Sequence, residues 1–336
     1  MSAGASQDKG PGTQEGKNRA SGLAFAMVAN MAPTVRQDCI SSAALQLRQR
    51  QKQSGGWGYF NSSQASIEAT CLSVLGLSPE HESVSSRAVE FLFKSQLADG
   101  AWPAFGGDTE GSWTTALALS TTIATNQMSA ECDHALKWLL IEKGMEGHWL
   151  WRWKFKTADR NVRFDSDKYG WPWGHGAGSW VIPTAFSVIA IKQYTVCARR
   201  EASEARIRLG VEMLFDRACV DGGWNSGNSV AYGVPLRPHI EATAIALLAL
   251  QDEKRNEVVD KSLLWLQQRA ATIESASSLA WTILSLFTYR ESIQQLQDRL
   301  VIMIGDGSGI SNNATLAMVL LALRCGEMIH PFMVLR

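Results

Sequence analysis

Apolar residues along the chain gather in six similar segments, each of them apolar on almost every side. The six read TCLSVLGL, TALALSTT, TAFSVIAI, TAIALLAL, LAWTILSL and LAMVLLAL, and they begin at Thr70, Thr115, Thr184, Thr243, Leu279 and Leu316. A helix that is apolar all round belongs in an interior rather than on a surface. The pattern therefore predicts six buried helices.

A more amphipathic segment precedes each apolar one, with charges opposite an i, i+3, i+4 apolar stripe that is typical of a surface helix. These segments span about 37–50, 84–97, 132–143, 204–218, 256–269 and 291–304. No alternating stretch long enough for a sheet lies between them. Two kinds of helix that alternate six times predict an all-α fold, an α/α toroid (barrel) of six helical hairpins with an inner apolar ring inside an outer amphipathic ring.

Three segments lie outside this repeat. Residues 1–21 are polar and are predicted to form a disordered tail, which leaves 22–336 as a single toroid domain. The apolar run 22–32 is too short to span a bilayer. A Trp- and Gly-rich insertion occupies about 144–179, and loops of that length within a compact domain are usually functional or disordered. Its tryptophans favour a functional loop.

Composition narrows the classes of partner. The 336 residues include 32 Lys and Arg against 32 Asp and Glu, so we expect no nucleic-acid partner. The six Cys form no CxxC pair, which argues against a disulfide framework and favours a cytoplasmic protein.

A short motif occurs twice at the ends of amphipathic segments, with a Gln six residues and a Gly two residues before a Trp. Glycine can adopt the left-handed conformation that ends a helix, and the Trp can pack over the next helix, so a packing role is expected. The two full copies are Gln51-Gly55-Trp57 and Gln96-Gly100-Trp102, the fourth repeat keeps Gly222 and Trp224, and the third and fifth keep only an aromatic-Leu pair at Trp138 and Trp265.

These residues resemble the QW motif of squalene–hopene cyclases and oxidosqualene cyclases, over about 37–323. The wider toroid superfamily includes class II terpene cyclases and protein prenyltransferase β subunits. The resemblance implies a terpene-cyclase-like protein that binds an isoprenoid or another apolar small molecule in a central apolar cavity, with acid-initiated cyclisation or prenyl chemistry and isomerase-like or prenyltransferase-like activity. Peripheral membrane contact, a partner chain and a homodimer stay open, since class II cyclases often have two rings.

The acid of that chemistry is not in its usual form. Class II cyclases that resemble this chain carry DxDD before a Thr-Ala pair, and the middle Asp protonates an alkene or epoxide; this sequence has no DxDD. HIEATA instead places Glu241 at the middle position and His239 at the first, while SIEATC places Glu68 in the same register. Desolvation at the mouth of an apolar ring could make Glu241 a general acid, with His239 holding or relaying its proton, and Glu68 is a further catalytic candidate by its register. The alternative is that both glutamates only stabilise helix N-termini.

Further candidates come mainly from the insertion. Asp165 and Asp167 are two more candidate acids, in a broken likeness of DxDD that lies out of register. Aromatic faces could bind a prenyl chain or stabilise a carbocation, although the Trp cluster could equally pack as a lid or stack on sugar rings. The substrate-binding candidates are Trp113, Tyr169, Trp171, Trp173, His175, Trp180 and Tyr232.

No cofactor is expected, because the chain lacks a nucleotide-binding loop, a G-x-S-x-G elbow and HExxH. Prenyltransferase β subunits hold zinc through Asp-x-Cys and a distant His, but here Cys219 and Asp221 stand in the reverse order, so no metal is predicted there or with His239. Two other functions remain open. A carbohydrate-active toroid, a lyase or hydrolase, would need two carboxylates in a cleft. A non-catalytic scaffold would have a filled ring with Glu241 paired to an arginine.

Overall fold

The computed structural model describes residues 33–77, 82–157, 164–198, 204–305 and 309–334. The predicted disordered tail 1–21 and the apolar run 22–32 lie outside the described residues.

All twelve predicted helices are present in the described part of the chain. The amphipathic segments form α2 (Pro33–Gln49), α4 (Glu82–Lys94), α6 (Ala130–Ile141), α9 (Glu204–Asp216), α11 (Glu257–Ala270) and α13 (Gln294–Ile304). The apolar segments form α3 (Ile67–Leu77), α5 (Thr114–Ala124), α8 (Val181–Ala198), α10 (Ile240–Ala249), α12 (Ala276–Thr288) and α14 (Asn313–Arg324). The insertion adds η1 (Met145–Gly147) and α7 (Trp149–Thr157), and a small hairpin pairs β1 (Val230–Ala231) with β2 (Val234–Pro235).

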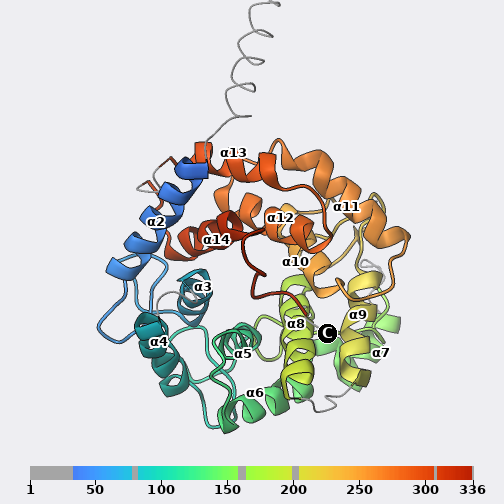
Figure 1. The fold of residues 1–336 in the computed structure, drawn as a ribbon. Coiled ribbons are helices and arrows are strands. Elements are labelled where there is room, and N and C mark those ends of the chain that lie inside the picture. The colour runs from blue at the N-terminus through green and yellow to red at the C-terminus, as the bar shows by residue number, and fades with distance from the viewer. Residues whose placement is uncertain (1–32, 78–81, 158–163, 199–203, 306–308, 335–336) are drawn as a thin grey trace, which may run out of the picture.

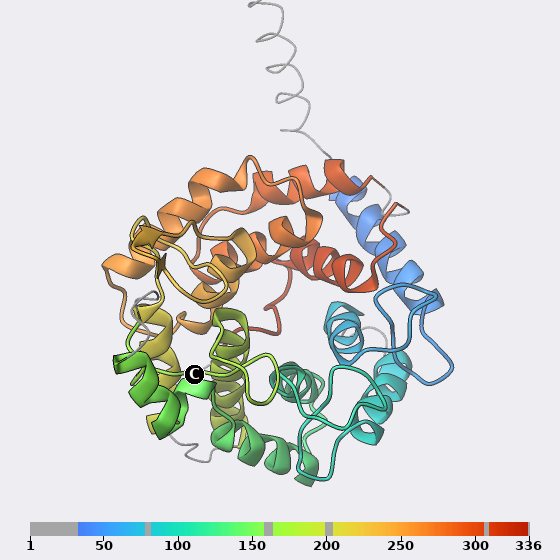
Figure 2. The same ribbon diagram turned by 180° about the vertical axis from the view of Figure 1, so that it is seen from behind.

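The inner helices form a closed ring (Figures 1 and 2). Helix α3 packs on α5, α5 on α8, α8 on α10, α10 on α12, α12 on α14, and α14 returns to α3. The outer ring closes where α2 contacts α13 and α14. The predicted all-α toroid is therefore confirmed.

Burial explains why the apolar segments are the inner ones. Helices α3, α5, α10 and α14 bury nearly every residue. Helix α3 approaches α14 so closely that a Cβ on Gly76 would lie 2.9 Å from the carbonyl oxygen of Ala317. Within the described residues, α8 is long and apolar enough to cross a membrane, but 72% of it is buried inside the ring, as expected of an inner helix.

The same pair of hydrogen bonds joins an outer helix to the next inner helix in four repeats. In each, a buried Trp donates its indole N–H to a Leu carbonyl of the outer helix and its backbone N–H to a Thr hydroxyl of the inner helix. The sets are Leu47-Trp57-Thr70, Leu92-Trp102-Thr115, Leu139-Trp171-Thr184 and Leu214-Trp224-Thr243. The packing role predicted for Trp57, Trp102 and Trp224 is confirmed.

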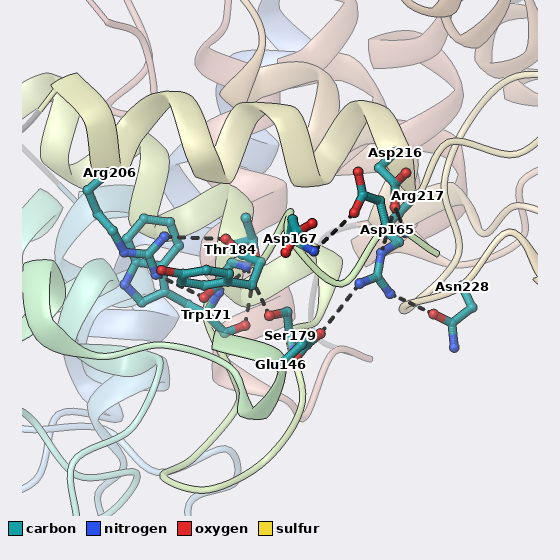
Figure 3. Close-up of polar contacts among 12 residues, drawn as sticks. Glu146, Asp165, Asp167, Trp171, Ser179, Thr184, Arg206, Asp216, Arg217 and Asn228 are labelled. Atoms are coloured by element: carbon teal, nitrogen blue, oxygen red, sulfur yellow. Dashed lines mark hydrogen bonds and ion pairs between the residues drawn. The ribbon is translucent and has the colours of Figure 1, made fainter. Parts of the chain in front are cut away.

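The fourth member of this set corrects a prediction. Trp171 was expected to bind substrate, but its side chain is 1% exposed and its indole is bonded to the outer ring. The third repeat thus keeps its structural Trp, which the insertion moves away from the aromatic-Leu pair. Arg206 takes the place of the missing Gln: its guanidinium carbon lies 3.3 Å from the Trp171 ring centroid, and it donates to the Glu142 and Gly170 carbonyls (Figure 3).

Buried charges tie the insertion to the ring (Figure 3). Glu146 accepts the backbone N–H of Ser179 at 3.0 Å and an N–H of Arg217 at 3.4 Å. Arg217, just after α9, also donates to Asn228 at 2.6 Å. Because a buried charge is costly unless it is paired, these contacts hold the insertion, α9 and the 225–239 segment in one arrangement.

Candidate active site in the central pocket

A pocket of about 340 Å³ opens at the end of the ring where the inner helices begin. First-turn or capping residues of all six inner helices reach it, so the six N-termini share one face of the toroid. The pocket is lined by Tyr59, Glu68, Leu72, Trp113, Leu117, Trp173, Ile182, Phe186, Glu241, Ile245, Ser277, Trp281, Asn312, Ala314, Thr315 and Met318.

Glu68 lies in the first turn of α3, and the preceding turn positions it. Ser66 caps the helix by accepting the Ala69 N–H, and its own backbone N–H bonds to the carbonyl of Trp57. The Tyr59 hydroxyl, two residues beyond that Trp, donates a hydrogen bond to the Glu68 carboxylate. The segment between the QW residue Trp57 and α3 thus places the Tyr59 hydroxyl against the Glu68 carboxyl group.

The surroundings of Glu68 favour its protonated form. Burial raises the pKa of the Glu68 carboxyl above its ordinary value, the Tyr59 hydrogen bond opposes that rise, and the negative charge of Glu241 adds to it. Burial also raises the pKa of the Tyr59 hydroxyl, which therefore remains a donor at neutral pH. A carboxyl group whose pKa is raised retains its proton to higher pH than an exposed one, which suits it to act as a general acid.

Glu241 lies in the first turn of α10 and faces the same pocket. Its Oε1 accepts hydrogen bonds from the hydroxyls of Ser277 at 3.0 Å and Ser278 at 3.1 Å, both in the first turn of α12. In the described part of the chain its partners are thus serines, whereas the scaffold alternative required an arginine. Glu68 and Glu241 do occupy helix N-termini, but they also bring two carboxyl groups of different surroundings into one cavity.

Aromatic rings form a continuous wall of this pocket. The centroid of the Trp113 ring lies 5.2 Å from that of Trp173, in an edge-to-face arrangement, and 5.4 Å from that of Phe186. The Phe186 centroid in turn lies 5.7 Å from that of Trp281. Trp173 reaches the pocket because its carbonyl accepts the backbone N–H of Trp113, which anchors the insertion over the start of α5. Trp113 and Trp173 therefore lie where a pocket-bound substrate would contact them, and their role in binding stays a prediction.

Asp165 and Asp167 lie away from the central pocket, which corrects their candidacy as acids there. Asp167 pairs with Lys156 at 2.6 Å and Arg152 at 3.6 Å, and Asp165 pairs with Lys168 at 3.5 Å. Their ion pairs are half-exposed, and the likeness to DxDD is a surface feature of the insertion.

The remaining predicted residues surround the rim or face outward. His239 occupies the N-cap position of α10 and lines two outer pockets, one of which Glu241 also lines. Within the described residues the Glu241 carboxylate bonds to serines rather than to His239, and the relay between the two stays a prediction. Trp180 lines one of those outer pockets, of about 550 Å³, beside Arg217. His175 contacts Glu142 at 3.3 Å, Tyr169 stacks under Arg152 and Arg206, and Tyr232 is 79% exposed in the β1–β2 turn.

The described residues contain no group of three His, Cys, Asp or Glu side chains arranged to hold a metal ion. Cys219, weighed as a zinc ligand, instead accepts a long contact from the Asn225 amide at 3.8 Å.

Several pocket residues escaped the sequence analysis, among them Tyr59, Phe186, Trp281 and Ser277. Tyr59 carried a usable signal, since it follows the QW residue Trp57 by two positions and precedes Glu68 by nine. Trp281 and Phe186 are large aromatic residues in inner helices that are otherwise rich in small and aliphatic residues. That contrast was the available signal that these two positions face a cavity.

Several solved structures share this fold at low sequence identity. A variant of the type II terpene cyclase MstE from Scytonema, in complex with its substrate geranylgeranyl dihydroxybenzoate, matches with a TM-score of 0.59 and 16% identity, over 86% of this chain and 97% of that chain. A protein from Actinoplanes matches with a TM-score of 0.60 and 14% identity, over 87% and 100% of the two chains. A glycosidase matches with a TM-score of 0.56 and 12% identity, over 88% and 98%.

No protein-family model and no curated protein matches the chain. At identities of 12–16% the structural likeness concerns the fold alone. It reaches type II terpene cyclases and glycosidases, and does not single out squalene–hopene cyclases. The chain therefore has a terpene cyclase-like α/α-toroid fold.

Proposed function

We propose that this protein is a terpene-cyclase-like enzyme in which Glu68 protonates a carbon–carbon double bond of an isoprenoid bound in the central pocket. One observation carries the proposal: a carboxyl group with a raised pKa lies in a pocket walled by Trp113, Phe186 and Trp281. The terpene cyclase fold, with a relative that binds a geranylgeranyl compound, supports it.

The proposed reaction is an isomerisation. The Glu68 O–H gives its proton to one alkene carbon, and the π electrons form the new C–H bond and leave a carbocation at the other carbon. Aromatic faces stabilise that cation, a second double bond attacks it to form a carbon–carbon bond, and Glu241 or water removes a proton at the end. The Tyr59 hydroxyl, already bonded to Glu68, stabilises the carboxylate that remains. Proton exchange with solvent restores Glu68.

The pocket indicates a small or folded substrate. Its volume of about 340 Å³ lies near the lower end of ligand pockets, which span roughly 300–1,000 Å³. The aliphatic residues Leu72, Ile182 and Ile245 complete its walls and offer apolar contact to a hydrocarbon chain, beside the polar groups that line its mouth.

Product analysis tests the proposal. Purified protein would be incubated separately with geranyl, farnesyl and geranylgeranyl alcohols, diphosphates and phenolic adducts, and the extracts analysed by gas chromatography and mass spectrometry. We expect a product of unchanged mass and one double bond fewer. A protein that neither converts nor binds any member of these series would overturn the proposal.

A glycosidase-like activity is the second candidate, because one specific observation favours it. Glu68 and Glu241 bring two carboxyl groups into one pocket, as glycoside hydrolysis requires, and a glycosidase shares the fold. Release of a chromogenic aryl alcohol from aryl glycosides, abolished by either Glu→Gln change, would favour it over cyclisation.

We further propose that contact with a membrane surface, if the substrate is delivered from lipid, involves α7. Trp149, Leu150 and Trp153 lie on one exposed face of this helix, with Trp149 75% and Trp153 65% exposed. Lys154 and Lys156 flank them, and tryptophans beside lysines suit an interface of anionic headgroups. Phe155 on the same helix shares a pocket with Trp180 and His239, which directly precede α8 and α10, so α7 lies beside the face where the central pocket opens (Figure 2).

We expect Trp149→Glu with Trp153→Glu to reduce binding to vesicles of phosphatidylcholine and phosphatidylserine about tenfold or more, because two apolar anchors become anions. Sedimentation with vesicles measures the bound fraction. Ile141→Glu, on α6 and 78% exposed in the native protein, is the matched control that should leave binding unchanged. Equal binding by all variants would exclude α7 as the contact.

A further inference from the structure

The segment after α14 crosses the toroid on the face opposite the mouth of the central pocket. Figure 1 shows it leaving α14 and running through the middle of the ring towards α8. Hydrogen bonds with α8, with the turn after α10 and with α12 hold this segment in place. Gln193 of α8 donates to the carbonyl of Pro331 at 2.7 Å, and Gln251, just after α10, donates to the carbonyl of Phe332 at 3.0 Å.

The buried His330 makes further polar contacts within this segment and with α12. His330 Nδ1 accepts the backbone N–H of Phe332 at 3.2 Å, and its Nε2 lies 2.7 Å from the Thr288 hydroxyl of α12. Burial lowers the pKa of His330 to about 4, so the ring is neutral at pH 7 and Nδ1 is free to accept. The tail is thus fixed by polar contacts on both sides of Phe332.

Phe332 projects from this segment into the axis of the ring. Its side chain is 0% exposed, and its ring lies 5.1 Å from that of Trp281 and 5.9 Å from that of Phe186. Both of those rings also line the central pocket. The phenyl group therefore stands behind the aromatic wall, at the end of the cavity away from its mouth.

A second cavity lies on the other side of the segment that carries Phe332, which we call the plug. It has a volume of about 390 Å³ and is lined by the ends of inner helices, including Leu75, Ile123 and Leu321, together with His330, Pro331 and Met333 of the tail. The tail and Phe332 thus lie between the central pocket and a second, predominantly apolar cavity.

We propose that Phe332 is a specificity-determining residue that lies directly behind Phe186 and Trp281, supports these two rings as the floor of the central pocket, and so limits the length of the chain that binds there. The inference rests on the proposed function for the identity of the ligand, a prenyl chain. The geometry of the floor itself applies to any linear apolar ligand that enters from the mouth.

The test compares chain-length selection between the protein and variants of its tail by titration calorimetry. Two ligand series would be used, geraniol, farnesol and geranylgeraniol on one side and straight-chain primary alcohols of matched lengths on the other. In the native protein we expect affinity to rise with length and then fall once the chain meets the floor that Phe332 supports. Phe332→Ala should move that maximum to a longer member of each series and strengthen binding of the longest by about tenfold or more.

Three further variants make the outcome decisive. Met333→Ala, a truncation in the same tail that faces the other cavity, should leave the maximum in place. Phe332→Leu keeps most of the side-chain volume and should give a smaller shift if Phe332→Ala fails to fold. A chain that ends at Ile329 lacks the plug altogether, while the contacts that close the ring through α2, α3, α13 and α14 remain.

The two series separate this inference from the proposed function. A maximum that stays at the same length in Phe332→Leu and in the shortened chain, in both series, would overturn the role of Phe332. Binding of straight-chain alcohols with the expected shift, but of no prenyl alcohol, would support the floor and contradict the isoprenoid substrate.

Discussion

Glu68→Gln is expected to lower turnover of an isoprenoid substrate by about 10²–10⁴-fold, the usual contribution of a general acid. Gln has nearly the same shape and can still accept the Tyr59 hydroxyl, so the pocket and substrate binding should be preserved while the transferable proton is lost. The measurement is the initial rate of product formation at saturating substrate, with the dissociation constant determined separately.

Asp167→Asn is the matched control, because it also replaces a carboxylate by an amide, but in a surface ion pair with Lys156. It should retain the native rate. If Glu68→Gln were as active as that control while Glu241→Gln were inactive, Glu241 would be the acid and the assignment of the two carboxyl groups would be reversed.

The pH dependence of the reaction rate is a second test of the role of Glu68. The active form of Glu68 is protonated, so the rate should be highest below its raised pKa and fall as pH increases through it. The hydrogen bond from Tyr59 lowers the pKa of Glu68, so Tyr59→Phe should move this alkaline decline to higher pH. A shift to lower pH would contradict the role given to Tyr59.

The fold was predictable because each local pattern agreed with the global one. Six apolar segments that alternate with six amphipathic ones leave few arrangements other than a ring, and the QW turns predicted that Trp57 and Trp102 join neighbouring hairpins. The register of HIEATA and SIEATC also brought Glu68 and Glu241 to notice. The sequence could not show that both side chains reach the same cavity, because α3 and α10 are not neighbours in the ring and face one another only when the ring closes.

The insertion explains most of the errors. It lengthens the chain between α6 and α8, so the spacing that identifies a QW Trp is lost and Trp171 resembles a free aromatic residue. Asp165 and Asp167 stand in a local pattern that only tertiary structure shows to be part of a surface cluster with Arg152, Lys156 and Lys168. Phe332 carried no signal, because its position under Trp281 depends on a tail that is held by distant glutamines.

The QW motif requires glycine at Gly55 and Gly100, and substitution by alanine tests this requirement. Gly55 has φ +94°, and a Cβ there would lie 2.3 Å from the carbonyl oxygen of Arg87 in α4. Gly55→Ala should therefore lower the free energy of unfolding by about 2–5 kcal/mol, through backbone strain together with overlap against the next outer helix. Urea denaturation followed by circular dichroism measures this change.

Gly107→Ala separates the two causes, because Gly107 has φ +101° but open space around the position of a Cβ. It should cost only about 1–2 kcal/mol, from strain alone. In the second motif copy a Cβ on Gly100 would lie 2.6 Å from the His134 carbonyl in α6, so Gly100→Ala should match Gly55→Ala rather than Gly107→Ala. Equal losses at all three sites would mean that neighbouring hairpins can separate to admit the methyl group. The QW turn would then fix the helix end without fixing the distance between hairpins, and the ring that positions Glu68 against Glu241 would have to be held by its inner helices.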